Sequence, residues 1–195
     1  MKLYLSTIGI AMAVIAAVNL LCATAAWYYV IPAVIWCTAL CFALDGAIAL
    51  VINKLPDRWF GVDNSLYRVS KRETALYKRL KVRVWKDRVW ELGGLGGFSK
   101  KKLREPDNPK YIEQFIVECN KGVLTHRLAY PVGFWMMLTL IPLCVWTIGL
   151  PVAVVNLFLN ILPTMVLRYN TPKLQAILKR LHHKHRQQEP RACDP

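Results

Sequence analysis

The chain has 195 residues, of which 55% are hydrophobic, yet its formal net charge at pH 7 is +14. A soluble globular domain rarely combines these values, whereas a membrane protein with a basic aqueous portion does. The 26 Lys and Arg residues are segregated. Lys2 is the only one before Lys54, eighteen fall in 53–127 and seven lie from Arg168 onward. No nucleic-acid-binding motif accompanies this charge, so we attribute it to membrane topology and expect no nucleic-acid partner.

The first apolar run, Leu3 to Ala26, is long enough to span the hydrocarbon core of a bilayer, which is about 30 Å thick. A secretory signal peptide is the competing interpretation, because Ala23-Thr24-Ala25 resembles a cleavage site. The apolar run is longer than a signal peptide requires, and Lys2 is its only preceding charge. We therefore favour a retained helix.

A second span is predicted from Val30 to Ile52, after an interfacial belt formed by Trp27, Tyr28 and Tyr29. Asp45 lies within this span. A carboxyl group inside a membrane is a functional candidate, but it can also be kept neutral or hydrogen-bonded to a neighbouring helix. Both interpretations remain open for Asp45.

The segment 53–127 is the basic aqueous part of the chain. Ser70 and Glu73 have the spacing of a capping box and predict a helix start. Apolar residues line one side of that helix and Lys and Arg crowd the rest; the apolar positions are Leu76, Tyr77, Leu80 and Val84. Such a helix lies on an anionic membrane surface and can also hold the phosphates of a substrate. A glycine cluster at 91–98, followed by Lys100-Lys101-Lys102, predicts a flexible turn or an anion cradle.

A further helix is predicted from Pro109 to His126, with Asn108 as its N-cap. Glu118 and His126 are eight residues apart, which is about 12 Å along an ideal helix. They can line one cleft without forming a hydrogen-bonded dyad. His126 is the only histidine outside the tail, and it suits either interfacial hydrogen bonding or general-base catalysis near neutral pH.

The C-terminal third predicts a span from Leu128 to Ile148, a tight hairpin at Gly149-Leu150-Pro151, and a span from Val152 to Leu167. Pro172 is expected to limit continuation of the last helix. This last span carries a polar stripe with a period of four residues, formed by Asn156, Asn160, Thr164 and Arg168. The stripe is either a packing surface between helices or one wall of a buried site.

These segments predict an all-α integral membrane protein with four transmembrane helices arranged as two hairpins. The hairpins are 1–52 and 128–167, joined by the basic helical loop 53–127, and the chain ends in a basic tail at 168–195. Because the turns on the far side carry no charge, the positive-inside rule places the loop and both termini in the cytoplasm of a multi-pass cell-membrane protein.

Several classes of site are excluded by motif. The sequence contains no GxSxG, HExxH, CxxC or HxxxxD pattern, and the six cysteines have no Cys/His ligand spacing. We therefore predict no metal site and no disulfide framework, and interpret the cysteines as reduced packing residues.

Four blocks of the chain resemble the family of glycosyl-4,4'-diaponeurosporenoate acyltransferases, which act in staphyloxanthin-type carotenoid biosynthesis. The blocks begin at Leu55 and occur in the same order: Leu55-Pro56-Asp57-Arg58-Trp59-Phe60, Lys81-Val82-Arg83-Val84-Trp85-Lys86, Ile112-Glu113 through Glu118 to His126, and Asn160 through Pro163 to Arg168-Tyr169-Asn170-Thr171-Pro172-Lys173-Leu174. The resemblance implies transfer of a fatty acyl group to a sugar hydroxyl of a membrane glycolipid. It also implies membrane lipids and a lipid-linked sugar acceptor as partners, with no bound cofactor and acyl-CoA or a similar donor as co-substrate.

On this interpretation we expect His126 to be the general base, supported by Glu118, with Asn170 and Arg168 stabilising the oxyanion. The predicted substrate-binding residues are Lys81, Arg83, Trp85, Lys86, Asn160 and Tyr169. Two other functions remain open: a non-catalytic scaffold or accessory subunit of a lipid-modifying complex, and a small transporter that uses Asp45 and the polar stripe.

Overall fold

The computed structural model describes residues 2–89, 103–141 and 144–188, and every regular element in these ranges is helical. The glycine cluster at 91–98 and the lysines that follow it lie outside the described residues. The chain divides into two compact units, each built from two separate segments. The first consists of Met1–Lys54 and Leu124–Thr164, and the second of Leu55–Val123 and Met165–Pro195.

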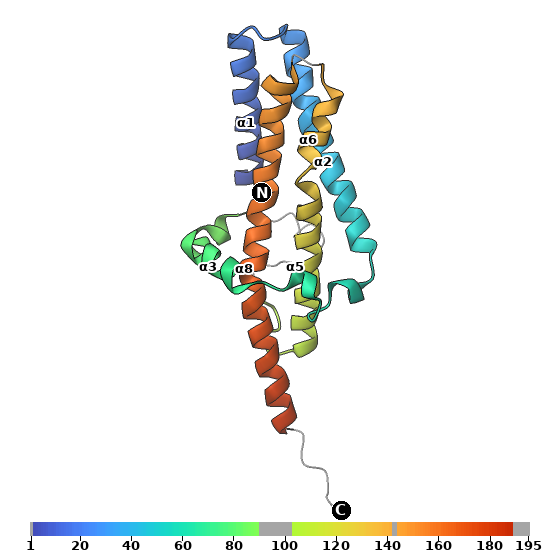
Figure 1. Ribbon diagram of the computed structural model, residues 1–195, viewed down its shortest axis with the longest axis vertical. Coiled ribbons are helices and arrows are strands. Elements are labelled where there is room, and N and C mark those ends of the chain that lie inside the picture. Colours follow the sequence, from blue (N-terminus) through green and yellow to red (C-terminus); the bar gives the residue numbers. More distant parts are fainter. Residues whose placement is uncertain (1, 90–102, 142–143, 189–195) are drawn as a thin grey trace, which may run out of the picture. The chain divides into compact units, whose positions relative to one another are not determined.

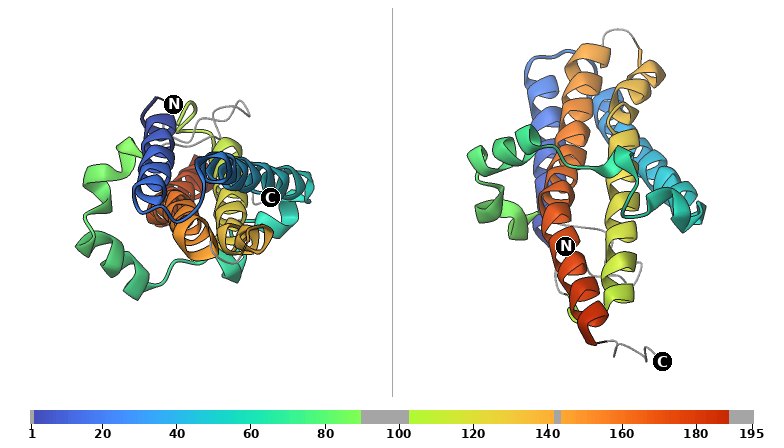
Figure 2. Two further views of the ribbon diagram at one scale, coloured as in Figure 1. Left: turned by 90° about the horizontal axis from the view of Figure 1, so that it is seen from above. Right: turned by 60° about the horizontal axis from the view of Figure 1, so that its bottom comes forward.

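The first unit contains α1 (Lys2–Leu21), α2 (Trp27–Lys54) and α6 (Val132–Met136), together with the last turns of α5 (Pro109–Ala129) and the first turns of α8 (Leu150–Gln188). A short turn connects α1 to α2 (Figure 1). Seen from above, α1, α2, α6 and the beginning of α8 gather into a bundle (Figure 2). Its core is apolar and includes Cys37, Cys41 and Cys144, which are buried and free. The prediction that these cysteines are packing residues is confirmed.

The predicted hairpin at Gly149-Leu150-Pro151 is wrong. Residues Val145–Gly149 form a π-helical turn that leads directly into α8. The glycine permits close packing instead of a turn, because a Cβ at Gly149 would lie 3.0 Å from side-chain atoms of Leu140 and Met137. Pro151 follows the π-helical turn directly, and local π adjustments can re-satisfy the backbone groups that a proline frees in a helix.

The predicted third span, Leu128 to Ile148, is also not one helix. α5 ends at Ala129, α6 is short, and a 3₁₀ turn, η5 (Met137–Thr139), follows it. Two described helices are long and apolar enough to cross a membrane, Trp27–Lys54 and the helix over Val145–Lys184. The four-span arrangement and its topology therefore stay a prediction.

α8 also continues past Pro172, against the expectation that the helix stops there. Threonines next to its prolines bond back onto the helix: Thr164 donates its hydroxyl to the carbonyl of Asn160, and Thr171 donates to that of Leu167, both at 3.0 Å. A packed helix can continue through a proline even though the ring removes one backbone bond.

The second unit contains α3 (Lys71–Arg79), α4 (Val82–Trp85), the remainder of α5 and α8, and the short 3₁₀ turns η1 (Asp57–Phe60), η2 (Ser65–Tyr67) and η3 (Lys86–Arg88). Both predicted caps are confirmed. Ser70 Oγ accepts from the amide of Glu73 at 3.1 Å, and Asn108 Oδ1 accepts from the amide of Lys110 at 3.1 Å. α3 is shorter than its apolar pattern predicted, because Lys81 adopts a left-handed conformation, with φ 51°, that ends the helical run.

Candidate functional site

Three polar side chains from three helices form a hydrogen-bonded network in the first unit. Nδ1 of His126, on α5, lies 2.9 Å from Oδ1 of Asn160, on α8. Nδ2 of Asn160 donates to Oδ2 of Asp45, on α2, at 3.0 Å. One amide therefore links the imidazole to the carboxyl group. Asn160 itself is 6% exposed, so it is shielded from competing water.

The neighbours of Asn160 determine the tautomer of His126. Nδ2 of Asn160 donates to Asp45 and also, at 3.0 Å, to the backbone carbonyl of Asn156. Because a carbonyl can only accept, the amide nitrogen must point toward these two groups and the amide oxygen toward the imidazole. Nδ1 of a neutral His126 then carries the proton, and Nε2 carries the lone pair. This is the tautomer that a general base acting through Nε2 requires.

Asp45 is hydrogen-bonded to a neighbouring helix, and its functional role stays a prediction. Its bond to Asn160 engages only Oδ2. The other oxygen, Oδ1, is buried and has no hydrogen-bond partner in the described part of the chain. An unbonded buried carboxyl oxygen is costly, commonly by about 1–3 kcal/mol.

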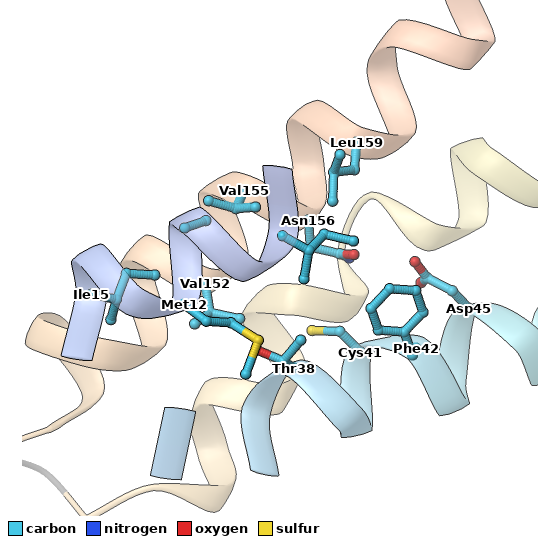
Figure 3. A pocket seen from close by; sticks show the side chains of 12 residues that line it. Met12, Ile15, Thr38, Cys41, Phe42, Asp45, Val152, Val155, Asn156 and Leu159 are labelled. Carbon is cyan, nitrogen blue, oxygen red and sulfur yellow. The ribbon is translucent and has the colours of Figure 1, made fainter. Parts of the chain in front are cut away.

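An apolar groove between α1, α2 and α8 ends beside this network (Figure 3). Asp45 and Asn156 lie toward one end of its lining, near Phe42, and Met12 and Ile15 lie toward the other. The groove therefore has one polar end and a long apolar wall.

In the second unit, Arg168 forms a buried ion pair with Glu73. Nε and Nη2 of Arg168 contact the two carboxylate oxygens, Nη2 at 2.6 Å, and Nη2 also donates to the carbonyl of Arg68 at 3.2 Å. Tyr77 donates its hydroxyl to the same carboxylate. Nη1 of Arg168 is buried without a hydrogen-bond partner among the described residues.

Electrostatics at this pair favour the ionised carboxylate. Burial of the Glu73 carboxyl raises its pKa, but hydrogen bonds from Arg168 and Tyr77 and the positive charge of Arg168 outweigh burial, so its pKa lies below the ordinary value. Burial also raises the pKa of Tyr77, and the adjacent carboxylate raises it further. The tyrosine therefore remains a hydrogen-bond donor near neutral pH.

Two of the predicted substrate-binding residues lie in the cluster of Tyr77, which donates to this pair. Trp85 and Tyr169 pack against the same buried cluster, formed by Tyr77, Val82 and Val166. Lys81, Arg83 and Lys86 come from the turn and short helices next to Trp85. Lys81 and Arg83 are exposed, whereas Lys86 and Asn170 are half-buried.

Glu118 belongs to a different set of contacts in the second unit. Its carboxylate accepts from Gln114 at 3.2 Å and lies 3.6 Å from Nζ of Lys121. Lys121 also forms an ion pair with Asp57 at 2.6 Å. The hydrogen bond from Lys121 is the largest influence on Asp57 and lowers its pKa. The contacts of Glu118 thus point to a role in holding Lys121.

The sequence predicts most residues of the candidate site but not the side chains with which they form hydrogen bonds and ion pairs. The position of Glu73 in a capping box predicts only its role at the helix start, and its pairing with Arg168 across 95 residues of sequence has no local signal. The link between Asp45 and Asn160 spans 115 residues. The rarity of a carboxyl group in an apolar run was the one sequence signal for Asp45.

The sequence pattern of one protein family, glycosyl-4,4'-diaponeurosporenoate acyltransferase, matches residues 56–180. This match covers more than half of the chain and includes His126, Asn160 and Arg168. Asp45 and the whole of α1 and α2 lie before it. No curated protein and no solved structure matches the chain significantly.

Proposed function

We propose that the chain, which belongs to the glycosyl-4,4'-diaponeurosporenoate acyltransferase family and is an acyltransferase, moves a fatty acyl group from an activated donor to a sugar hydroxyl of a membrane glycolipid. Family membership implies action on a carotenoid glycoside. The donor in this proposal is acyl-CoA or a carrier of similar chemistry, and the site of transfer is His126 with its network. Two long apolar helices support a membrane location.

The observation that carries the proposal is the network of His126, Asn160 and Asp45. Nε2 of His126 would remove the proton from the acceptor hydroxyl as its oxygen attacks the thioester carbonyl carbon. The carbonyl oxygen becomes an oxyanion, the carbon–sulfur bond then breaks, and the protonated imidazole returns the proton to the leaving thiolate. The products are an ester and a free thiol, and the loss of the proton to the thiolate returns His126 to its neutral form with a lone pair on Nε2, as a catalyst requires.

Two further roles are part of the proposal. The buried Nη1 of Arg168, which has no partner among the described residues, is suited to hydrogen-bond an oxyanion, and Asn170 would assist it. Lys81, Arg83 and Lys86 would hold the donor phosphates as charge-assisted donors. Trp85 and Tyr169 supply apolar contact surface beside these cations.

The test measures acyl transfer in membranes that contain the full chain, with lipid mass spectrometry detecting products heavier by one acyl group. His126→Ala should lower the rate by about 10²- to 10⁴-fold, the usual contribution of a general base. His183→Ala is the matched control, because His183 is an exposed histidine of the C-terminal helix, and it should retain the wild-type rate. A well-expressed His126→Ala protein with the wild-type rate would remove His126 from the mechanism.

A further inference from the structure

The groove between α1, α2 and α8 is not explained by the acyl-transfer chemistry alone. Nine of its twelve lining residues are apolar, and the three polar ones are Thr38, Asp45 and Asn156. Along α1 the lining runs from Ile8 to Ile15, and along α8 from Val152 to Leu159. Seven residues of helix cover about 10 Å. The lining therefore runs about 10 Å along each of these two helices, as a shallow groove with about 30 Å³ of free space.

Only one polar lining atom lacks a partner. The hydroxyl of Thr38 donates to the carbonyl of Val34 at 2.9 Å. Nδ2 of Asn156 donates to the carbonyl of Ala129 at 3.5 Å, and its Oδ1 accepts from Nδ2 of Asn160 at 3.4 Å. Oδ1 of Asp45, in contrast, is buried and unbonded among the described residues. A ligand that completes this site must present a hydrogen-bonding group at the polar end of an apolar tail.

The chemistry of the unpaired oxygen distinguishes the two substrates of an acyl transfer. If the acyl chain of the donor filled the groove, its polar end would be a thioester carbonyl, which only accepts hydrogen bonds. A hydroxyl both donates and accepts, so it satisfies the carboxyl oxygen of Asp45 in either protonation state. Asp45 is also linked through Asn160 to the imidazole that would deprotonate the acceptor.

We propose that this groove binds the apolar tail of the hydroxyl-bearing acceptor, with one acceptor hydroxyl hydrogen-bonded to Oδ1 of Asp45. The inference rests on the proposed function and assigns its acceptor subsite. α1 and α2, which lie before the family match at 56–180, supply Asp45 and most of the lining. The range of acceptors is then a property of this chain's own N-terminal helices, whereas His126 and Asn160 lie in the matched region.

The experiment uses the full chain purified in lipid nanodiscs and a dodecyl β-D-glucoside that carries a photoreactive diazirine on its alkyl chain. Cross-links located by mass spectrometry should fall on groove residues such as Met12 and Cys41. Unlabelled dodecyl glucoside should compete, whereas its tetra-O-methyl derivative, which has the same tail but no hydroxyl donor, should compete roughly tenfold less well. Asp45→Leu should abolish this preference for the free glucoside.

A matched pair of variants on α1 tests the groove itself. Ala11 lines the groove, whereas Ala13 is exposed on the same helix. Ala11→Phe should reduce cross-linking at least several-fold, and Ala13→Phe should leave it unchanged. Equal effects of the two variants, or equal competition by the free and methylated glucosides, would overturn the proposal and identify the groove as a site for ordinary lipid tails.

Cross-linking needs neither an acyl donor nor turnover, so it is measured independently of the proposed function. His126→Ala should therefore label like the wild type while losing transfer. If the wild-type protein transfers acyl groups but the free and methylated glucosides compete equally for labelling, the acceptor site alone is overturned. Hydroxyl-dependent labelling in a protein that acylates no lipid would instead overturn the proposed reaction, and with it the assignment of the ligand as an acceptor.

Discussion

Nδ1 of His126 lies 2.9 Å from Oδ1 of Asn160, although the two residues are 34 positions apart in sequence and on different helices. This contact determines which imidazole nitrogen carries the proton, because the amide of Asn160 is oriented by Asp45 and by the carbonyl of Asn156. Asn160 is therefore a positioning residue for the proposed base. Its predicted role in substrate binding stays a prediction.

Asn160→Leu is expected to lower kcat by roughly 10- to 100-fold at nearly constant KM, since it frees the imidazole of His126 from the hydrogen bond that orients it. It should also cost about 2 kcal/mol of stability, because both oxygens of Asp45 are left unpaired. The double variant Asp45→Leu/Asn160→Leu should recover part of the stability, since it removes the unpaired carboxyl group, although Nδ1 of His126 and Oδ1 of Asn156 still lose the side chain of Asn160. Its activity should remain low.

Thermal unfolding of the three proteins in detergent, together with kcat and KM, checks this prediction. Recovery of activity along with stability in the double variant would contradict a positioning role. It would show instead that Asn160 acts only by stabilising the bundle.

Glu73→Gln is expected to flatten the acid limb of the stability profile. The pKa of Glu73 is lowered on folding. Its ionised carboxylate therefore stabilises the folded protein above its unfolded pKa of about 4.3, and this stabilisation is lost as the pH falls through the pKa of the folded state. The glutamine removes this titration and leaves the cation of Arg168, whose side chain is 6% exposed, without its counter-charge. At neutral pH the variant should be about 3 kcal/mol less stable.

Unfolding measured between pH 7 and pH 3 tests the prediction. Asp107→Asn serves as the control, because Asp107 is exposed and should leave the profile unchanged. An acid limb as steep in Glu73→Gln as in the wild type would show that other carboxyl groups dominate the pH dependence.

Lys81→Gly separates backbone conformation from charge at a predicted phosphate contact. Lys81 has φ 51°, a conformation that costs a residue with a side chain about 1 kcal/mol and that glycine adopts freely. The variant should fold at least as well as the wild type, and its KM for acyl-CoA should rise about threefold to fivefold with little change in kcat. Lys81→Arg, which keeps the charge, should retain the wild-type KM; an unchanged KM in Lys81→Gly would exclude a phosphate contact.

Gly133→Ala is expected to destabilise the first unit. A Cβ at Gly133 would lie 2.7 Å from Cα of Ala153, so α6 and α8 would have to separate. Overpacking of this kind typically costs about 1–3 kcal/mol. Gly9→Ala is the control, since a Cβ there meets nothing within 4 Å, and it should be neutral or slightly stabilising. Equal unfolding midpoints for the two variants would contradict the close helix contact.

Local features of the sequence are sufficient to predict the helical class, the caps at Ser70 and Asn108, and the chemistry of the candidate residues. These follow from local rules: caps depend on side chains within one turn, and charge segregation is visible in composition. His126 stood out because it was the only histidine outside the tail. The family resemblance also came from the linear order of short blocks, and the match over residues 56–180 confirmed it.

Which of these residues contact one another depends on the packing of helices that are far apart in sequence. Gly149 and Pro151 looked like a turn, but packing against Leu140 and Met137 made the glycine a contact point and let α8 begin there. Likewise, nothing local pairs Arg168 with Glu73 or joins Asp45 through Asn160 to His126. A buried polar group takes its partner from whichever helix packs against it, so its pairing is a property of the packed fold rather than of sequence spacing.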